Sequence, residues 1–205
     1  MQLYLVRHGQ TIANLHYDDY AWDNNEALTP LGVREASAAA AWLRAEKMEL
    51  DVVCASPLLR AQQTAEIIAK EFGIAAQEDD GLIEANVGEW RTRIGAAVYA
   101  QFMELPPARR FTFCPPAGET WAQAGQRVAR VAERFARQGA ARVVLVSHAV
   151  PIQCAIGVLT GAPYAAWPQW SIDNASLTCL TFAGGTWQLN FADKIVYGVN
   201  RGNVR

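Results

Sequence analysis

The stretch Leu3-Tyr4-Leu5-Val6-Arg7-His8-Gly9 decides the fold, because a short apolar run delivers an arginine and a histidine at its end. Such a run predicts a buried β-strand. A second run, Val143-Val144-Leu145-Val146-Ser147, leads in the same way to His148, and a third, Asp51-Val52-Val53-Cys54-Ala55, is followed by Arg60. The carboxyl ends of parallel strands meet at one edge of an open α/β sheet, where such folds place their ligands. We therefore expect these two arginines and two histidines to share one site.

Two arginines and two histidines at one sheet edge indicate a site for phosphate. Arginine presents a planar fork of N–H donors that matches phosphate oxygens. Imidazole can act as a hydrogen-bond donor, a nucleophile or a base. A dianionic phosphoryl group is therefore the expected ligand.

Strand-like runs alternate with amphipathic helical stretches along the chain. This alternation predicts parallel strands joined by crossover helices. The expected fold class is α/β, a three-layer α/β/α sandwich with a mostly parallel central sheet and helices on both faces. We expect a single domain over residues 1–205, since no repeat or linker interrupts the pattern. The expected helices cover about residues 29–47, 58–72, 94–104, 119–139 and 151–161, and a closing hairpin covers 177–182 and 186–191.

Local signals mark the ends of these helices. Thr29 followed by Pro30 is typical of a helix N-terminus. Gly73 is placed to end the second helix. Glu119 favours the start of the fourth helix because its carboxylate complements the helix dipole. Pro151 is expected to open the fifth.

The composition limits the partners that we expect. A content of 51% hydrophobic and 19% charged residues is ordinary for a globular domain. A formal net charge of -2 argues against a nucleic-acid or membrane-surface partner, because either would favour a concentrated basic excess. The apolar run that starts almost at Met1 leaves no room for a signal peptide, so cytoplasmic localisation is expected, as a monomer or homodimer. Neither a zinc site nor a disulfide framework is expected from the four well-separated cysteines, Cys54, Cys114, Cys154 and Cys179.

Several separated motifs resemble the histidine phosphatase superfamily, also called phosphoglycerate mutase-like, along nearly the whole chain. The most specific is Ser56-Pro57-Leu58-Leu59-Arg60-Ala61-Gln62-Gln63-Thr64-Ala65, which resembles the second arginine block of the family. Arg7-His8-Gly9 with Thr11 and Asn14 resembles its N-terminal signature. The other matching segments are Leu28-Thr29-Pro30-Leu31-Gly32, Leu82-Ile83-Glu84 with Gly88 and Trp90, His148, and Asn174-Ala175-Ser176.

The resemblance implies a role for each of these side chains. His8 would attack phosphorus in line, giving a phosphohistidine that water later hydrolyses. Its other ring nitrogen must keep its proton, and a backbone carbonyl near Gly9 is the expected acceptor. Glu84 would protonate the departing alkoxide and then activate water, which requires a carboxyl pKa raised by partial burial. No metal ion or cofactor is expected. The groups expected around the transferring oxygens are Arg7, Arg60 and His148, supplemented by Thr11 and Asn14.

Departures from the family pattern bear on the substrate. Many members carry Trp-Glu-Gly where this chain has Trp90-Arg91-Thr92. Arg91, together with Arg93, would bind a second anionic group of a sugar phosphate, nucleotide or bisphosphate. Alternatively, the change of charge is a surface difference without a functional consequence. Ala149 replaces the usual glycine after the second histidine and keeps the backbone N–H that would contact phosphate. The loops at 17–22 and 99–113 are expected to set specificity.

The resemblance implies a metal-independent phosphomonoesterase that acts on a small phosphorylated metabolite. A phosphoglycerate mutase is one alternative. The mutases of the family tend to carry an insertion that shields the phosphoenzyme, whereas only a short stretch separates Trp90 from Pro115 here, so water access favours hydrolysis. A non-catalytic phosphate sensor is the other alternative. Loss of His8 or Glu84 would mark a sensor, and both residues are present.

Other conspicuous residues have a structural interpretation. The tryptophans are expected in core or lid packing rather than in a pocket for an aromatic or sugar group. His16 is expected in a surface loop. The arginines of the stretch 119–139 fall opposite its apolar face, which predicts a solvated surface. The residues concerned are Trp22, Trp90, Trp121, Trp167 and Trp170, and Arg127, Arg130, Arg134 and Arg137.

Overall fold

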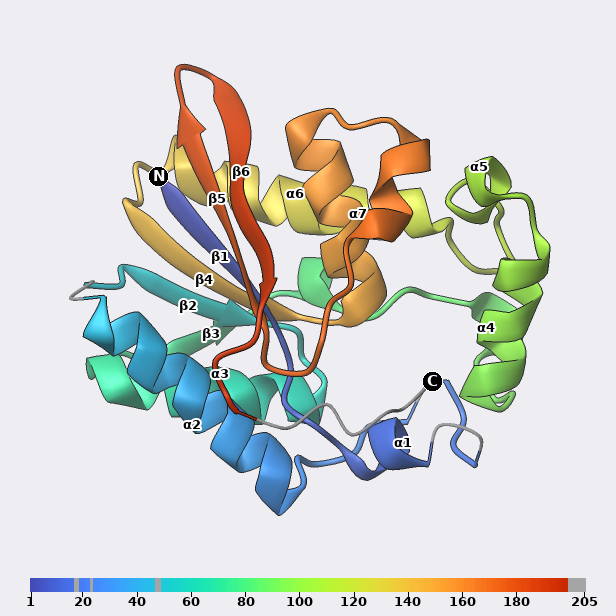
Figure 1. Cartoon of the computed structure of the whole chain (residues 1–205), viewed down its shortest axis with the longest axis horizontal. Helices are drawn as coiled ribbons and strands as arrows, with labels where there is room; N and C mark the ends of the chain where they lie inside the picture. The colour runs from blue at the N-terminus through green and yellow to red at the C-terminus, as the bar shows by residue number, and fades with distance from the viewer. Residues whose placement is uncertain (17–18, 23, 47–48, 199–205) are drawn as a thin grey trace.

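One sheet lies at the centre of the molecule (Figure 1). The computed structural model describes residues 1–16, 19–22, 24–46 and 49–198. Within these residues the sheet has six strands in the order β3-β2-β4-β1-β5-β6. Pairing is parallel from β3 to β1 and antiparallel between β1, β5 and β6. The strands are β1 (Gln2–Arg7), β2 (Val52–Ala55), β3 (Ala76–Glu78), β4 (Arg142–Ser147), β5 (Leu177–Ala183) and β6 (Thr186–Lys194).

Helices cover both faces of the sheet. Figure 1 shows α2 and α3 on one face and α6 and α7 on the other. This arrangement confirms the expected α/β sandwich. The helices are α1 (Ile12–Leu15), α2 (Pro30–Ala45), α3 (Leu59–Phe72), α4 (Gly95–Glu104), α5 (Pro107–Arg110), α6 (Trp121–Arg137) and α7 (Ala149–Thr160), with 3₁₀ segments η1 (Asp80–Leu82), η2 (Gly88–Trp90) and η3 (Tyr164–Gln169).

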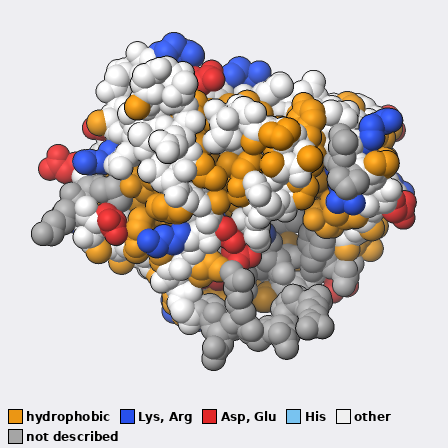
Figure 2. All heavy atoms as spheres, turned by 45° about the horizontal axis from the view of Figure 1, so that its top comes forward, with side chains coloured by type: hydrophobic (Ala, Val, Ile, Leu, Met, Phe, Trp, Pro, Cys, Tyr) orange, Lys and Arg blue, Asp and Glu red, His pale blue; other side chains and the backbone are white. Residues whose placement is uncertain are grey.

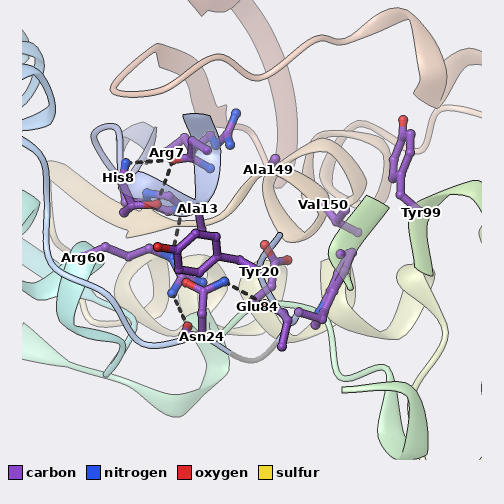
Figure 3. Close-up of a pocket in the computed structure, with 15 residues that line it drawn as sticks. Arg7, His8, Ala13, Tyr20, Asn24, Arg60, Glu84, Tyr99, Ala149 and Val150 are labelled. Carbon is purple, nitrogen blue, oxygen red and sulfur yellow. Dashed lines mark hydrogen bonds between the residues drawn. The ribbon is translucent and has the colours of Figure 1, made fainter. Parts of the chain in front are cut away.

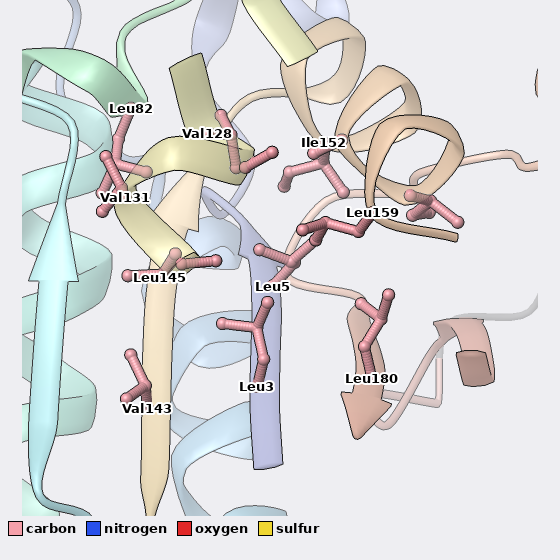
Figure 4. Close-up of a cluster of buried hydrophobic side chains, with 14 of the residues drawn as sticks. Leu3, Leu5, Leu82, Val128, Val131, Val143, Leu145, Ile152, Leu159 and Leu180 are labelled. Carbon is pink, nitrogen blue, oxygen red and sulfur yellow. The ribbon is translucent and has the colours of Figure 1, made fainter. Parts of the chain in front are cut away.

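The central strands are buried on both sides, because successive side chains of a strand point to opposite faces of the sheet. Leu3, Leu5 and Leu145 belong to the core beneath α6 and α7 (Figure 4). Tyr4 and Val146 belong to the core beneath α2 and α3. The uninterrupted apolar runs of the sequence therefore supply two cores at once.

A third core is formed by residues of α4, α6, α7 and η3 together with loop residues. Figure 1 shows α4 at the right, away from the sheet. Phe102, Phe111 and Trp121 are buried in it. The rings of Phe102 and Trp121 stack with centroids 4.3 Å apart. This aromatic packing gives α4, which borders the site described below, a rigid support.

Hydrophobic side chains also reach the surface. Figure 2 shows them across the middle of one face. Large apolar side chains that are more than a third exposed include Leu15, Ile94 and Tyr99. Single exposed apolar residues are common on folded proteins. None of the helices in the described ranges has the length and apolar character that crossing a membrane requires.

Helix ends agree with the predictions at most positions. The hydroxyl of Thr29 accepts a backbone hydrogen bond of 3.0 Å from the first turn of α2. The predicted end of this helix, near Lys47, lies outside the described residues. Gly73 follows α3 with φ of 68°, in the left-handed region that favours glycine. α7 begins at Ala149, two residues before the predicted Pro151.

The start of α6 differs from the prediction. The hydroxyl of Thr120 accepts a hydrogen bond from the Gln123 backbone N–H at 3.0 Å, and the Gln123 side chain accepts one from the Thr120 N–H at 2.8 Å. This reciprocal capping box fixes the start of the helix at Trp121. Glu119 instead accepts a hydrogen bond from the backbone N–H of Asn86 at 2.8 Å.

Candidate active site

The expected site residues come together where β1 and β4 end. These strands pair in parallel, with Arg7 opposite Ser147. His8 and His148 follow directly, and their ring centroids are 5.1 Å apart. Arg60 reaches the same point from the first turn of α3. We call Arg7, His8, Arg60 and His148 the phosphoryl cage.

His8 is a neutral imidazole with a defined tautomer. Its Nε2 lies 3.2 Å from Nε of Arg60, which can only donate, so Nε2 accepts. Its Nδ1 therefore carries the proton and donates to the carbonyl of Gly9 at 2.8 Å, the acceptor that the sequence predicts. Burial, and then the charges of Arg60 and Arg7, hold the pKa of His8 well below its ordinary value. At neutral pH Nε2 thus carries the lone pair that a nucleophile requires.

Both arginines are anchored by backbone carbonyls. Arg7 donates through Nη1 to Ile172 at 2.8 Å, and Arg60 donates through Nη1 to Asn24 at 2.8 Å. Burial lowers the pKa of both guanidinium groups, and the nearby Glu84 carboxylate opposes that shift. The buried Nε of Arg7 has no hydrogen-bond partner among the described residues. Because an unpaired buried donor costs free energy, this N–H marks a place for an acceptor atom of a ligand.

His148 offers a second donor of this kind. Its Nε2 lies 2.9 Å from the hydroxyl oxygen of Ser56. Its buried Nδ1 lies 4.0 Å from the Glu84 carboxylate and makes no hydrogen bond within the described part of the chain. Burial, and then the charge of Arg60, hold the pKa of His148 well below its ordinary value. When Nε2 accepts from Ser56, the neutral ring carries its proton on Nδ1.

Glu84 follows η1 and lies beside the cage. Its side chain is 19% exposed. Its Oε1 accepts a hydrogen bond from the backbone N–H of Ala85 at 2.8 Å. Burial raises the pKa of Glu84, although this N–H and the charges of Arg60 and Arg7 act in the opposite direction. A raised carboxyl pKa suits a group that protonates a leaving oxygen.

Arg127 supports the Glu84 segment, and the prediction of a solvated surface is wrong for this residue. Its guanidinium donates to the carbonyls of Gly81 at 3.0 Å and Ile83 at 3.3 Å. It also pairs with Glu119 at 2.6 Å, and its side chain is 19% exposed. The helical pattern of α6 identifies its apolar face but does not reveal that η1 covers its flank. The remaining arginines of α6 are Arg130, which is exposed, Arg134, which pairs with Asp79, and Arg137, which pairs with Glu133.

Thr11, Asn14 and Ala149 all line the pocket, and their contact with phosphate stays a prediction. Oδ1 of Asn14 accepts hydrogen bonds from the Thr11 backbone N–H at 3.0 Å and from Nδ2 of Asn174 at 3.1 Å, so its amide nitrogen is the end left for a ligand. Asn174 also donates to the carbonyl of His8 at 3.1 Å. The sequence motif contains Asn174 but does not indicate this supporting role. Ala149 begins α7, where backbone N–H groups lack intrahelical partners.

Arg91 does not line the pocket. It is exposed at the end of η2. The guanidinium of Arg93 lies 5.5 Å from the ring centroid of Trp90 and donates to Gln101 at 3.2 Å. Binding of a second anion by Arg91 stays a prediction.

The cage opens into a pocket of about 240 Å³ (Figure 3). Tyr20 and Trp22, from the first loop expected to set specificity, line it. Tyr99 lines it too, but the expectation of a loop is wrong for this residue, which lies in α4. Residues 17–18 of the first loop lie outside the described residues. Figure 3 shows Arg7 on one side of the pocket and Tyr99 on the other. The pocket therefore has a cationic end and an aromatic end.

Four lining residues are missed by sequence reasoning, namely Ala13, Asn24, Gly95 and Val150. Asn24 lies in a loop without a motif, and only the start of α7 places Val150 beside Ala149. His16 is exposed, as predicted. Trp22 is the tryptophan that lines the pocket, whereas the others pack in or against the cores, as expected for Trp90, Trp121, Trp167 and Trp170.

Comparison with known proteins identifies the family. Residues 3–194 match the model of the histidine phosphatase superfamily (branch 1), and the chain belongs to this family. A bifunctional protein of Mycobacterium tuberculosis is 31% identical over 188 residues, which cover 88% of this chain and 50% of that protein. The chain thus spans about half the length of this relative. A probable phosphoglycerate mutase of Yersinia enterocolitica is 28% identical over 195 residues, which cover 91% of this chain and 87% of that protein.

Solved structures show the same fold. A protein described as mycobacterial hydrolase 1 superposes with a TM-score of 0.80 at 26% identity, covering 95% of this chain and 98% of that one. A mycobacterial glucosyl-3-phosphoglycerate phosphatase in complex with VO3 has a TM-score of 0.80 at 26% identity, covering 94% of this chain and 99% of that one.

Proposed function

We propose that the protein is a metal-independent phosphomonoesterase that hydrolyses a small phosphorylated metabolite through a phosphohistidine on His8. Family membership supports phosphoryl chemistry. We further propose that it acts as a monomer or homodimer in the cytoplasm, without a nucleic-acid or membrane partner.

The observation that carries this proposal is the state of the cage. A neutral His8 presents the lone pair of Nε2 among positively charged and neutral donors. Two buried side-chain nitrogens, Nε of Arg7 and Nδ1 of His148, have no hydrogen-bond partner in the described part of the chain. A tetrahedral phosphoryl group supplies both an electrophile for the lone pair and oxygens for the donors.

In the first step Nε2 of His8 attacks phosphorus, and the bond from phosphorus to the ester oxygen breaks. Nitrogen gains a bond to phosphorus, and the departing alkoxide takes the proton of the Glu84 carboxyl group. The raised pKa of Glu84 favours the protonated form that this step needs. The guanidinium groups of Arg7 and Arg60 would stabilise the charge on the transferring oxygens.

In the second step water replaces the histidine. The water oxygen attacks phosphorus and gives a proton to the Glu84 carboxylate, while the bond to Nε2 breaks and its electron pair returns to nitrogen. Inorganic phosphate leaves, and Glu84 is protonated again. The enzyme thereby regains its starting state, with water as its co-substrate and without a redox partner.

Hydrolysis of p-nitrophenyl phosphate in the presence of EDTA tests this function. Wild type is expected to turn over, and His8→Ala is expected to lose the activity because no nucleophile remains. His16→Ala removes an exposed histidine and serves as the matched control. Activity that needs added metal, or that persists in His8→Ala, would exclude the mechanism.

Two further measurements distinguish the proposed phosphatase from a mutase and from a phosphate sensor. A mutase would pass the phosphoryl group of labelled phosphoenzyme to an added alcohol, whereas the proposed enzyme releases inorganic phosphate. A sensor would bind vanadate tightly and show no turnover on any phosphoester.

A further inference from the structure

The pocket beyond the phosphoryl cage lacks charge. Apart from the cage and Glu84, its described lining is uncharged, with Tyr20, Trp22, Asn24, Tyr99 and Val150 as its largest side chains. Figure 3 shows Tyr99 and Val150 across the pocket from Arg7 and His8. The part that faces the alcohol of a bound phosphomonoester is therefore neutral and rich in aromatic groups.

Neither arginine of the cage is free for a second anion. Arg60 donates to the Asn24 carbonyl and to His8, and Arg7 donates to the Ile172 carbonyl. The proposed function assigns their remaining donors to the single phosphoryl group. Apart from the two arginines of the cage, the described lining offers no cation to a carboxylate or second phosphate on the alcohol. An anion brought there would lose its hydration without gaining a counter-ion.

Hydrogen bonds hold the segments that carry the aromatic side chains of the pocket in place. The backbone N–H of Gly95 donates to the carbonyl of Tyr20 at 2.8 Å, and that of Trp22 donates to the carbonyl of Arg93 at 3.1 Å, which ties the first loop to the start of α4. The Trp22 indole N–H donates to the Ala85 carbonyl at 2.9 Å. The two walls are therefore positioned before a ligand arrives, as in most small-molecule sites.

Tyr99 is the main flat surface at this end. It is 42% exposed, yet its ring stacks on Trp121 with centroids 6.2 Å apart and an interplanar angle of 23°. An exposed ring that is held by a buried one loses little freedom when a second ring packs against it.

We propose that the preferred substrates are phosphomonoesters of neutral alcohols that carry one aromatic or flat apolar ring, and that esters with a second carboxylate or phosphate are poor substrates. This inference rests on the proposed phosphatase function. It identifies the class of leaving alcohol, which the cage alone does not determine.

A panel of alkyl phosphates tests the inference, because the leaving oxygens are then similar in basicity. Glycerol 3-phosphate and 3-phosphoglycerate form a matched pair, in which a hydroxymethyl group is exchanged for a carboxylate. We expect kcat/KM to be about tenfold higher for benzyl phosphate than for glycerol 3-phosphate, and lowest for 3-phosphoglycerate. A preference for 3-phosphoglycerate over both neutral esters would overturn the proposal.

Variants at Tyr99 test whether this ring causes the preference for benzyl phosphate. Tyr99→Ala is expected to raise KM for benzyl phosphate about tenfold and KM for glycerol 3-phosphate by less, so that the preference for benzyl phosphate is lost, and Tyr99→Phe should retain the preference. Tyr164→Ala removes another partly exposed tyrosine, outside this pocket, and should change neither value. Equal losses on both substrates in Tyr99→Ala would contradict a role for the ring in selecting the alcohol.

Binding decides the question even if the enzyme turns nothing over. Calorimetry with benzylphosphonate and 3-phosphonopropionate, which are not hydrolysed, compares a neutral ring with a second carboxylate. Tighter binding of benzylphosphonate to wild type, weakened in Tyr99→Ala, supports the ligand class independently of catalysis. Tighter binding of 3-phosphonopropionate overturns it, whether or not the phosphatase function holds.

Discussion

At the scale of single residues, Glu84 and His8 divide the chemistry according to their environments. Burial raises the pKa of the carboxyl group and lowers that of the imidazole, so one group tends to hold a proton and the other to lack it. Both shifts favour the states that the first step needs. The same low polarity therefore prepares an acid and a nucleophile side by side.

Glu84→Gln is expected to separate the two steps. A p-nitrophenolate ion leaves without a proton, so rapid mixing with p-nitrophenyl phosphate should give a burst of product stoichiometric with enzyme. Steady-state turnover should then fall by about 100- to 10,000-fold, because no base activates water. Glu89→Gln, at an exposed position outside the pocket, provides the control. Unchanged steady-state turnover in Glu84→Gln would exclude this role.

Residues at strand ends could be placed from the sequence because the strand pattern itself brings them together. Arg7, His8 and His148 are of this kind. Asn174 and Arg127 donate hydrogen bonds to backbone carbonyls of other segments, and no periodic pattern in the sequence predicts such a contact. Sequence reasoning thus located the groups expected to touch phosphate but missed those that hold them.

At the scale of elements, α6 positions the segment that bears Glu84. Arg127 is the link, since it joins the helix to the carbonyls after η1 and to Glu119, which itself binds the backbone of Asn86. Its charge also lowers the pKa of Glu84. Arg127 is therefore a positioning residue with an electrostatic signature.

Arg127→Ala is expected to reduce kcat/KM about 10- to 100-fold through misplacement of Glu84. The alkaline limb of the pH profile should also move to higher pH. Activity is lost as Glu84 loses its proton, and without the nearby cation this occurs at higher pH. Arg127→Lys should lower the rate but keep the limb, and Arg130→Ala should match wild type. An unmoved limb in Arg127→Ala would leave Arg127 a purely structural role.

The types of the long helices and strands can be predicted from sequence periodicity, whereas short elements cannot. β3 has no apolar run, and two of its three residues are exposed. It pairs with β2 at the sheet edge, so its register depends on a neighbour rather than on its own side chains. The start of α6 could have been found from Thr120 and Gln123, whose spacing is that of a capping box.

At the scale of the whole molecule, one sheet separates two cores, and β4 contributes to both. Leu145 is fully buried on the side of α6 and α7. Leu145→Ala is expected to lower the free energy of unfolding by about 2–5 kcal/mol, because a central cavity cannot collapse fully. Urea denaturation measures this change.

Leu15→Ala is the matched control for that experiment. Leu15 is 55% exposed, so its truncation is expected to alter the free energy of unfolding by less than about 0.5 kcal/mol. Similar losses in the two variants would contradict the placement of Leu145 in the core. The position of this core was predictable from the apolar runs. The aromatic core around α4 was not, since it joins loop residues and α4 to residues of α6 and α7 that are distant in the sequence.

The hydrogen bond from Arg60 to His8 limits which ligands can reach Nε2 of His8. While Nε2 accepts the Arg60 N–H, its lone pair is covered, and an uncharged electrophile has nothing to offer the guanidinium in exchange. A phosphoryl group does, because its oxygens are stronger acceptors than imidazole nitrogen. In the proposed mechanism, the residue that binds the charge of the substrate thereby uncovers the atom that attacks phosphorus.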